Sequence, residues 1–275
     1  MILSFHPCVV TDENRICAGR SPDHQDLAAI RRADAVVLPQ GCTPDLYRMA
    51  RENCRHVFPD YDARFAFPGK IGQIRLFRKH RAPHPQTEII ADVPAFRSRL
   101  EQDPAGPLGF PYLIKLDWGG EGRTIFALRS AADLDRSLFD VLQSPGVQES
   151  GLLVQRFVPC GGRVLRVTVI GRQRLTYWRV ADDDHQPLAG LALGGHIQRN
   201  LDPILQQAAT VEIDTFCAKT GINLGGFDVI FPQNEPKPLL LEINYFFGRE
   251  GLGGSAAFYQ LLNAEIRRWI EDLRR

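Results

Sequence analysis

The 275-residue sequence lacks a strong excess of charge of either sign, because 33 Lys and Arg residues stand against 32 Asp and Glu residues. A formal net charge of +1 provides no field that would attract nucleic acid or an anionic membrane. No apolar run approaches the roughly 20 residues that a membrane span requires. The opening segment MILSFHPCVV has neither the basic flank nor the long apolar core of a signal peptide. We therefore expect a cytoplasmic protein with no nucleic-acid or membrane partner.

Several chemical motifs are also absent. The six cysteines form no CxxC pair, which argues against a zinc ribbon or a thioredoxin-like site, and free thiols in a reducing compartment are expected. The seven histidines show no HExxH or comparable spacing. Neither GxxxxGK[ST] nor a GxGxxG that opens a helix occurs, so P-loop and Rossmann phosphate binding are excluded. The remaining composition, 44% hydrophobic and 24% charged, is that of an ordinary globular protein.

The first half of the chain alternates between strand-like and helix-like segments. Short apolar runs and two helical stretches over residues 1–65 predict a small parallel sheet with β-α-β-α-β order. The segment 69–90 predicts a helix, a proline-marked turn and a strand, and helices follow near Val93 to Gln102 and from about Ala131 to Gln143. The strands YLIKL and TIFAL lie on either side of a glycine-rich loop.

The second half contains more consecutive strands. LLVQRFV, RVLRVTVIG and RLTYWRVA predict an antiparallel meander. Residues 202–221 predict a helix that Asp202 caps and Gly221 ends. After the strands GFDVIF and LLLEIN, an amphipathic helix from about Ser255 closes the chain.

The last two strands carry a concentration of acidic side chains. FDVIF and LLLEIN are separated by the turn PQNEPKP and predict an antiparallel hairpin. A turn symmetric about Glu235 places Asp228 opposite Glu242, and Asn244 shares the face of Glu242. Like charges that face each other destabilise a sheet, and three converging oxygen ligands suit Mg²⁺. From the hairpin alone, a solvated hairpin end or pairing with arginines explains the acids equally well.

A lysine lies in the strand before the glycine-rich loop. PYLIKLDWGGEG places Lys115 in an apolar strand, and Gly119, Gly120 and Gly122 allow backbone N–H groups to approach phosphate oxygens. A lysine beside such a loop supplies a point charge for phosphates. Taken alone, the same pattern fits a strand-edge lysine followed by an ordinary turn.

The order of these motifs resembles the ATP-grasp superfamily, especially the RimK-like and glutathione-synthetase-like ligases. The resemblance covers roughly Gly69 to Gly254 and rests on GKIGQIRLFRKH, PYLIKLDWGGEG, LLVQRFV, RVLRVTVIG, HIQRN, GGFDVIF and LLLEIN in this order. It implies an α/β (α+β) ATP-grasp fold in which two lobes clasp a nucleotide. The expected domains are an N-terminal parallel α/β domain (1–68), a central subdomain with the glycine lid (69–150) and a C-terminal subdomain with the metal site (151–275).

The resemblance also implies roles for individual residues. Arg166, together with Arg199 or Gln198, would stabilise the charge of the γ-phosphate, substrate and intermediate. Asp228, Glu242 and Asn244 would hold one or two Mg²⁺ (or Mn²⁺) ions. The implied ATP-binding residues are Lys70, Lys115, Gly119, Gly120, Gly122, Gln155, Phe157, Val158 and Asn200.

Three segments depart from the family pattern. Arg156 stands after the hinge glutamine, where relatives usually carry an acid, and Val164 replaces an acidic residue that contacts ribose in relatives. NYFFGREGLGGS replaces the short N-x-x-P-G segment of the family. These departures bear on base preference and on the acceptor, while the phosphate and metal residues remain.

The activity that the resemblance implies is that of an ATP- and Mg²⁺-dependent carbon–nitrogen ligase. ATP would convert a carboxylate into an acyl phosphate, and an amine would displace phosphate to give an amide or peptide bond plus ADP. The alternatives are an ATP-grasp-type phosphotransferase acting on a hydroxyl and a non-catalytic nucleotide-binding module. The substrates are expected to be small-molecule or peptide carboxylates and amines, whose identity the sequence does not reveal. Homodimers are common among relatives, but no segment of the sequence marks an interface.

Overall fold

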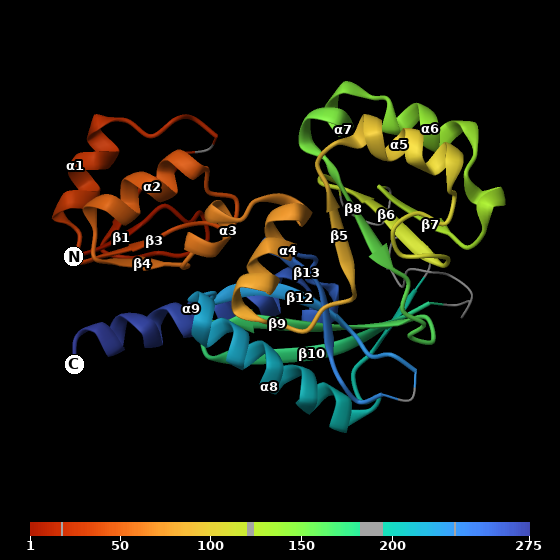
Figure 1. Cartoon of the computed structure of the whole chain (residues 1–275). Helices are drawn as coiled ribbons and strands as arrows, with labels where there is room; N and C mark the ends of the chain where they lie inside the picture. The colour runs from red at the N-terminus through yellow and green to blue at the C-terminus, as the bar shows by residue number, and fades with distance from the viewer. Residues whose placement is uncertain (18, 120–123, 182–194, 234) are drawn as a thin grey trace.

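Three β-sheets with helices on their faces make up the part of the chain that the computed structural model describes, residues 1–17, 19–119, 124–181, 195–233 and 235–275 (Figure 1). Helix α4 (Gly69–His80) follows the short helix α3 (Asp62–Ala66) and lies where the three parts of the molecule meet. It contacts strands of both the middle and the C-terminal sheet. Residues near the start of α4 are therefore held between these two sheets.

The N-terminal sheet is parallel, with the strand order β2-β1-β3-β4. Its elements are β1 (Ile2–Ser4), β2 (Glu13–Asn14), α1 (His24–Arg32), β3 (Ala35–Val37), α2 (Pro44–Asn53) and β4 (His56–Phe58). Because successive strand residues point to opposite faces, Leu3 and Val36 share a core with α1 and α2, whereas Ile2 and Val37 pack with the last helix, α9 (Gly254–Leu273). The predicted parallel sheet is confirmed, and the C-terminal helix covers its second face (Figure 1).

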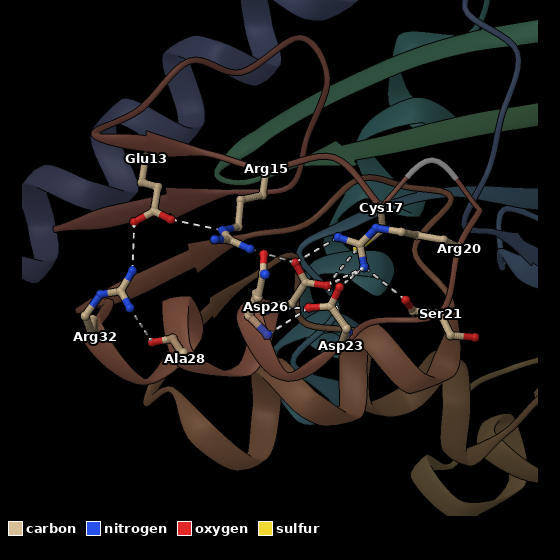
Figure 2. A network of polar contacts seen from close by, with 10 residues as sticks. Glu13, Arg15, Cys17, Arg20, Ser21, Asp23, Asp26, Ala28 and Arg32 are labelled. Atoms are coloured by element: carbon tan, nitrogen blue, oxygen red, sulfur yellow. Dashed lines mark hydrogen bonds and ion pairs between the residues drawn. The ribbon is translucent and has the colours of Figure 1, made fainter.

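A polar network fixes the loop that leads into the first helix of this domain (Figure 2). The Asp26 side chain is fully buried, and its two carboxylate oxygens accept hydrogen bonds from Arg20 at 2.6 and 3.0 Å. Arg15 donates a further bond to Asp26 at 3.3 Å, and Asp23 forms a capping box with Asp26 at the start of α1. Buried carboxylates require such partners, so the network ties the chain after β2 to the start of α1.

The middle sheet is antiparallel, with the strand order β5-β8-β6-β7. Its strands are β5 (Thr87–Ile90), β6 (Tyr112–Leu116), β7 (Ile125–Leu128) and β8 (Leu152–Arg156). One face packs on α5 (Val93–Gln102), α6 (Arg136–Leu142) and α7 (Pro145–Ser150), with Ile114, Leu116 and Val154 in the core. The other face carries Lys115 and Gln155, because these residues alternate with the apolar ones.

The C-terminal sheet is antiparallel, with the strand order β11-β10-β9-β12-β13. Its strands are β9 (Arg163–Ile170), β10 (Gln173–Val180), β11 (His196–Gln198), β12 (Leu224–Ile230) and β13 (Leu239–Asn244). Helix α8 (Pro203–Thr220) covers one face, where Trp178, Phe216 and Phe227 form the core. Arg166, Arg179, Asp228 and Glu242 project from the opposite face.

Three local predictions are corrected by the structure. Only β9 and β10 pair as the predicted meander, because LLVQR forms β8 and joins the middle sheet between β5 and β6. The predicted helix over Ala131 to Gln143 divides into a 3₁₀ turn (Ala131–Asp133) and α6. Asp202 precedes α8 but makes no capping bond, because its carboxylate accepts a bond from Arg163 at 2.6 Å. Gly221 ends α8 in a left-handed conformation, as predicted.

A 3₁₀ turn (Glu250–Leu252) precedes α9, which is the last helix of the chain. The longest helices are α8 with 18 residues and α9 with 20. Among the described residues, no helix combines the length and the apolar character needed to cross a bilayer.

Candidate active site

Two carboxylates face each other on the side of the last hairpin that is turned away from α8. Asp228 of β12 is paired with Glu242 of β13, and Asn244 lies opposite Gly226. On the other side of β12, Asp228 is paired with Arg166 of β9. The predicted hairpin and its register at Asp228 are confirmed, and the register shifts by one residue immediately beyond this pair. The structure thus brings together the two acids and Arg166 on one face.

Asp228 is held by two arginines. Its Oδ1 atom accepts from Arg166 Nε at 2.7 Å and contacts Arg179 Nη2 at 2.5 Å, whereas Oδ2 accepts from Arg166 Nη2 and from Asn244 Nδ2, both at 3.2 Å. Burial acts to raise the pKa of Asp228, but the charges and hydrogen bonds of the two arginines outweigh it and lower the pKa to about 2. Asp228 is therefore ionised at neutral pH, and each of its carboxylate oxygens has two contacts within the protein.

Glu242 is in a different electrostatic environment. Burial and the neighbouring charge of Asp228 raise its pKa, while Lys70, Lys115 and Arg166 act in the opposite direction. Among the described residues, none donates a hydrogen bond to the Glu242 carboxylate. Glu242 is thus the acid of this pair whose oxygens are available to a ligand.

Lys115 reaches the same space from the middle sheet. Its side chain is 6% exposed, and Nζ donates to Gln155 Oε1 at 2.6 Å. Gln155 Nε2 in turn donates to Thr87 Oγ1 at 2.9 Å, so β8 and β5 orient the lysine. Burial lowers the pKa of Lys115 to about 8, with Glu242 and Asp228 raising it and Lys70 lowering it. These electrostatic effects indicate that Lys115 of the middle sheet lies near Lys70 of α4 and near the two acids of the C-terminal sheet.

Lys70 is positioned by contacts at the start of α4. Its Nζ atom donates to the carbonyl oxygens of Trp118 and Gly119 at 3.3 and 2.8 Å, and the neighbouring Ile71 N–H donates to Asp117 at 2.7 Å. A Cβ atom at Gly69 would lie 2.5 Å from the Asp117 carboxylate, so only glycine permits this approach. The start of α4 is thereby joined to the loop after β6.

Gln73 joins the same helix to the strand that carries Glu242. Its side chain donates to the Ile243 carbonyl at 2.9 Å and accepts from the Ile243 N–H at 2.8 Å. This pair of bonds satisfies the backbone of an edge strand. Lys70 is therefore fixed relative to the acidic hairpin.

Arg179 is a site residue that the sequence analysis did not identify. Its side chain is 16% exposed, and it contacts Asp228 from β10. Tyr177 lies opposite Arg166, and residues two apart on a strand share a face, so the pairing of β9 with β10 places Arg179 on the site face. Once the pairing of β9 with β10 is known, the two-residue period of the strand is sufficient to predict that Arg179 lies on the same face as Arg166.

The remaining predicted residues lie at varying distances from this cluster. Val158 packs at an apolar cluster of Val164, Ala181 and Ile230, and Phe157 lines a cavity of about 260 Å³ beside β6 and β7. Arg199 is exposed, and its Nη2 atom donates to the Gly251 carbonyl at 3.2 Å. Asn200 and Gln198 are not brought to Asp228 by any contact among the described residues. Gly119 lies beside Lys70, whereas Gly120 and Gly122 fall outside the described residues.

Neither of the two unusual hinge residues adds charge to the cluster, because Arg156 points away from it and Val164, on the same face of β9 as Arg166, is uncharged. Arg156 donates to the Leu108 carbonyl at 2.9 Å and to Gln86 at 3.1 Å, on the helix-covered side of the middle sheet. Val164 is 7% exposed and belongs to the apolar cluster beside Val158. The replacement of acidic residues at these positions therefore adds no positive charge near Asp228 and Glu242.

The site as a whole carries more positive than negative charge. Four basic side chains (Lys70, Lys115, Arg166 and Arg179) surround the two acids Asp228 and Glu242. Such a cluster attracts a polyanion, and the two acids with Asn244 supply the oxygen atoms that a hard divalent cation prefers. A phosphate-bearing ligand accompanied by a divalent cation satisfies both requirements.

Comparison with known proteins identifies the fold. No family model matches the sequence, and a search of curated proteins gives no match either. Among solved structures, a RimK-domain ATP-grasp protein from Sphaerobacter thermophilus superposes with a TM-score of 0.62 at 14% identity. This alignment covers 96% of the present chain and 98% of that protein.

Longer proteins share the same architecture. The N5-carboxyaminoimidazole ribonucleotide synthetase of Thermotoga maritima superposes with a TM-score of 0.61 at 15% identity, over 96% of this chain and 68% of that one. The carboxyaminoimidazole ribonucleotide synthase of Aspergillus clavatus, solved with ATP, gives 0.57 at 15% identity over 89% of this chain. The present chain spans 62% of the length of that synthase. These similarities confirm the expected ATP-grasp fold.

Proposed function

We propose that this protein is an ATP- and Mg²⁺-dependent carboxylate–amine ligase that forms an amide or peptide bond and releases ADP and phosphate. The observation that carries the proposal is the facing pair of Asp228 and Glu242 within a set of four basic side chains from two sheets and helix α4. The ATP-grasp fold supports the assignment, because the structure of the Aspergillus clavatus synthase with this fold was solved with ATP.

The four basic residues would have two different roles in phosphoryl transfer. Lys70 and Lys115 would bind the phosphates of ATP, and Gln155 holds the Lys115 ammonium in place. Arg166 and Arg179 would stabilise the negative charge that moves from the phosphoryl group to the acyl phosphate. Stabilising charge with fixed groups is usually the largest contribution to such catalysis.

The donor set at the hairpin fits a magnesium ion. Asp228, Glu242 and the amide oxygen of Asn244 are hard oxygen ligands on one face. Bound there, Mg²⁺ would neutralise charge on the phosphates of the nucleotide. No protein nucleophile is needed, because the substrate carboxylate attacks the γ-phosphate and the amine then displaces phosphate from the acyl carbon.

The direct test is ADP release in the presence of ATP, Mg²⁺ and a panel of carboxylate and amine pairs. The proposal requires ADP formation that depends on both the acid and the amine, with phosphate as the second product. Amine-independent formation of a stable phosphorylated compound would identify a phosphotransferase. Nucleotide binding without turnover across the panel would indicate a binding module.

Nucleotide binding should weaken as the pH rises through about 8. Burial lowers the pKa of Lys115 to about 8, so its ammonium loses the proton well below the usual lysine range. Above this pH, affinity for a non-hydrolysable ATP analogue should fall by up to about tenfold per pH unit. Calorimetric titration from pH 6.5 to 9.5 measures the effect, and in Lys115→Met the inflection should be absent. A constant affinity in wild type up to pH 9.5 would contradict this role of Lys115.

A further inference from the structure

The acceptor capacity of Asp228 is completely used within the protein. An ionised carboxylate offers about four lone-pair positions, and Asp228 has four contacts: two from Arg166, one from Arg179 and one from Asn244. A divalent cation needs a direct bond to a carboxylate oxygen. As long as both arginines hold Asp228, this oxygen is not available to a cation.

Arg166 and Arg179 differ in the number of contacts that they make with Asp228. Arg166 donates from both Nε and Nη2, whereas Arg179 makes one contact through Nη2. The buried Nε atom of Arg179 has no hydrogen-bond partner among the described residues. A buried guanidinium N–H without an acceptor is unfavourable, so Arg179 has a donor ready for a further anionic oxygen.

Charge in the site favours an anion over a free cation. Lys70, Lys115, Arg166 and Arg179 give four positive charges, and Asp228 and Glu242 give two negative charges. A divalent cation that approaches alone meets net repulsion, whereas a phosphate group meets attraction. The same phosphate provides the oxygen atoms that Arg179 lacks.

We propose that Arg179 exchanges between Asp228 and a phosphate oxygen, and that this exchange makes cation binding conditional on phosphate binding. When a phosphate takes Arg179, Asp228 loses one donor and its Oδ1 atom becomes available to the cation. Nucleotide and cation then bind with positive coupling, and by reciprocity each strengthens the binding of the other. The inference rests on the proposed function, since it assigns the order in which the ligands of that site bind.

The test measures the two ligands separately, so that complexes between Mn²⁺ and nucleotide in solution do not interfere. Mn²⁺ binding to the protein alone is followed by the loss of the free-ion electron paramagnetic resonance signal. Binding of a non-hydrolysable ATP analogue without metal is followed by calorimetry in EDTA. In Arg179→Gln, we expect the Mn²⁺ affinity to rise at least fivefold and the metal-free nucleotide affinity to fall at least fivefold.

The opposite signs distinguish exchange from a merely structural role, which would weaken both ligands together. Arg174→Gln is the matched control, because Arg174 lies on the same strand, points to the other face and pairs with Asp214. Arg179→Lys keeps the charge but cannot reproduce the planar guanidinium contact, so its Mn²⁺ affinity should also rise, by less. If Arg179→Gln does not fold, the Mn²⁺ affinity of Arg179→Lys tests the exchange instead.

Three further outcomes separate the inference from the proposed function. An unchanged or lower Mn²⁺ affinity in folded Arg179 variants, or tight Mn²⁺ binding by wild type alone, would overturn the inference while leaving the ligase proposal intact. If wild type binds no nucleotide with or without Mn²⁺, the proposed function fails and the inference fails with it.

Discussion

Replacing Lys115 with methionine is expected to reduce ADP formation by about a hundred- to a thousandfold, the effect typical of removing one fixed donor to a transition-state charge. The loss should appear both as a higher KM for ATP and as a lower kcat, because the ammonium binds the phosphates of the nucleotide and also contacts the charge that develops during transfer. Steady-state ADP release over a range of ATP concentrations measures it.

The fold should tolerate this substitution. Lys115 is 6% exposed in a strand of apolar neighbours, and methionine fills a similar volume without the cost of burying a charge. Thermal unfolding should therefore occur at a similar temperature, because removing the buried charge offsets the loss of the hydrogen bond to Gln155. Lys219→Met, at the exposed end of α8, is the matched control and should leave turnover unchanged. Full activity of Lys115→Met would remove Lys115 from the phosphate site.

Asp228→Asn is expected to lower the free energy of unfolding by about 3–5 kcal/mol, because it leaves two buried arginines without their counter-ion. Arg166 and Arg179 are 7% and 16% exposed in their side chains, so water does not replace the lost contacts. Urea denaturation with a common m-value measures the difference. The pKa of Asp228 is lowered in the folded protein, so its stabilising effect is present above about pH 4 and is lost as the pH falls towards 2.

Glu242→Gln is the control for Asp228→Asn, because Glu242 lies directly opposite Asp228 in the same hairpin. Burial and the charge of Asp228 raise the pKa of Glu242, so a neutral glutamine should leave the stability equal or increase it. Both variants should lose the additional thermal stabilisation that Mg²⁺ gives to the nucleotide complex. Equal destabilisation by the two substitutions would contradict the distinction between a paired and an unpaired acid.

Local rules are sufficient for much of the architecture. The symmetry of the PQNEPKP turn and the two-residue period of strands predict that Asp228 faces Glu242, and the structure confirms it. The same symmetry is wrong beyond this pair, where Val229 lies opposite Leu240 because the ladder is irregular there. A symmetric turn gives no information about a bulge farther along the strand.

Other features depend on which strands become neighbours. LLVQR has the pattern of a buried strand and would fit either sheet, but its pairing with β5 and β6 brings Gln155 to Lys115. The arginine pairing of Asp228, one alternative that the hairpin left open, exists because β9 lies beside β12. Whether a metal ion displaces part of this pairing stays a prediction.

Short-range patterns in the sequence were sufficient to predict the parallel N-terminal sheet, the hairpin with its facing acids and the lysine within an apolar strand, because each follows from a strand or helix period or from a turn. The tertiary structure alone decided that Arg179 joins Asp228, that α9 covers the first sheet and that Lys115 and Glu242 share one space. These arrangements bring together residues far apart in the chain, and their energy comes from burial and charge compensation that no local pattern contains.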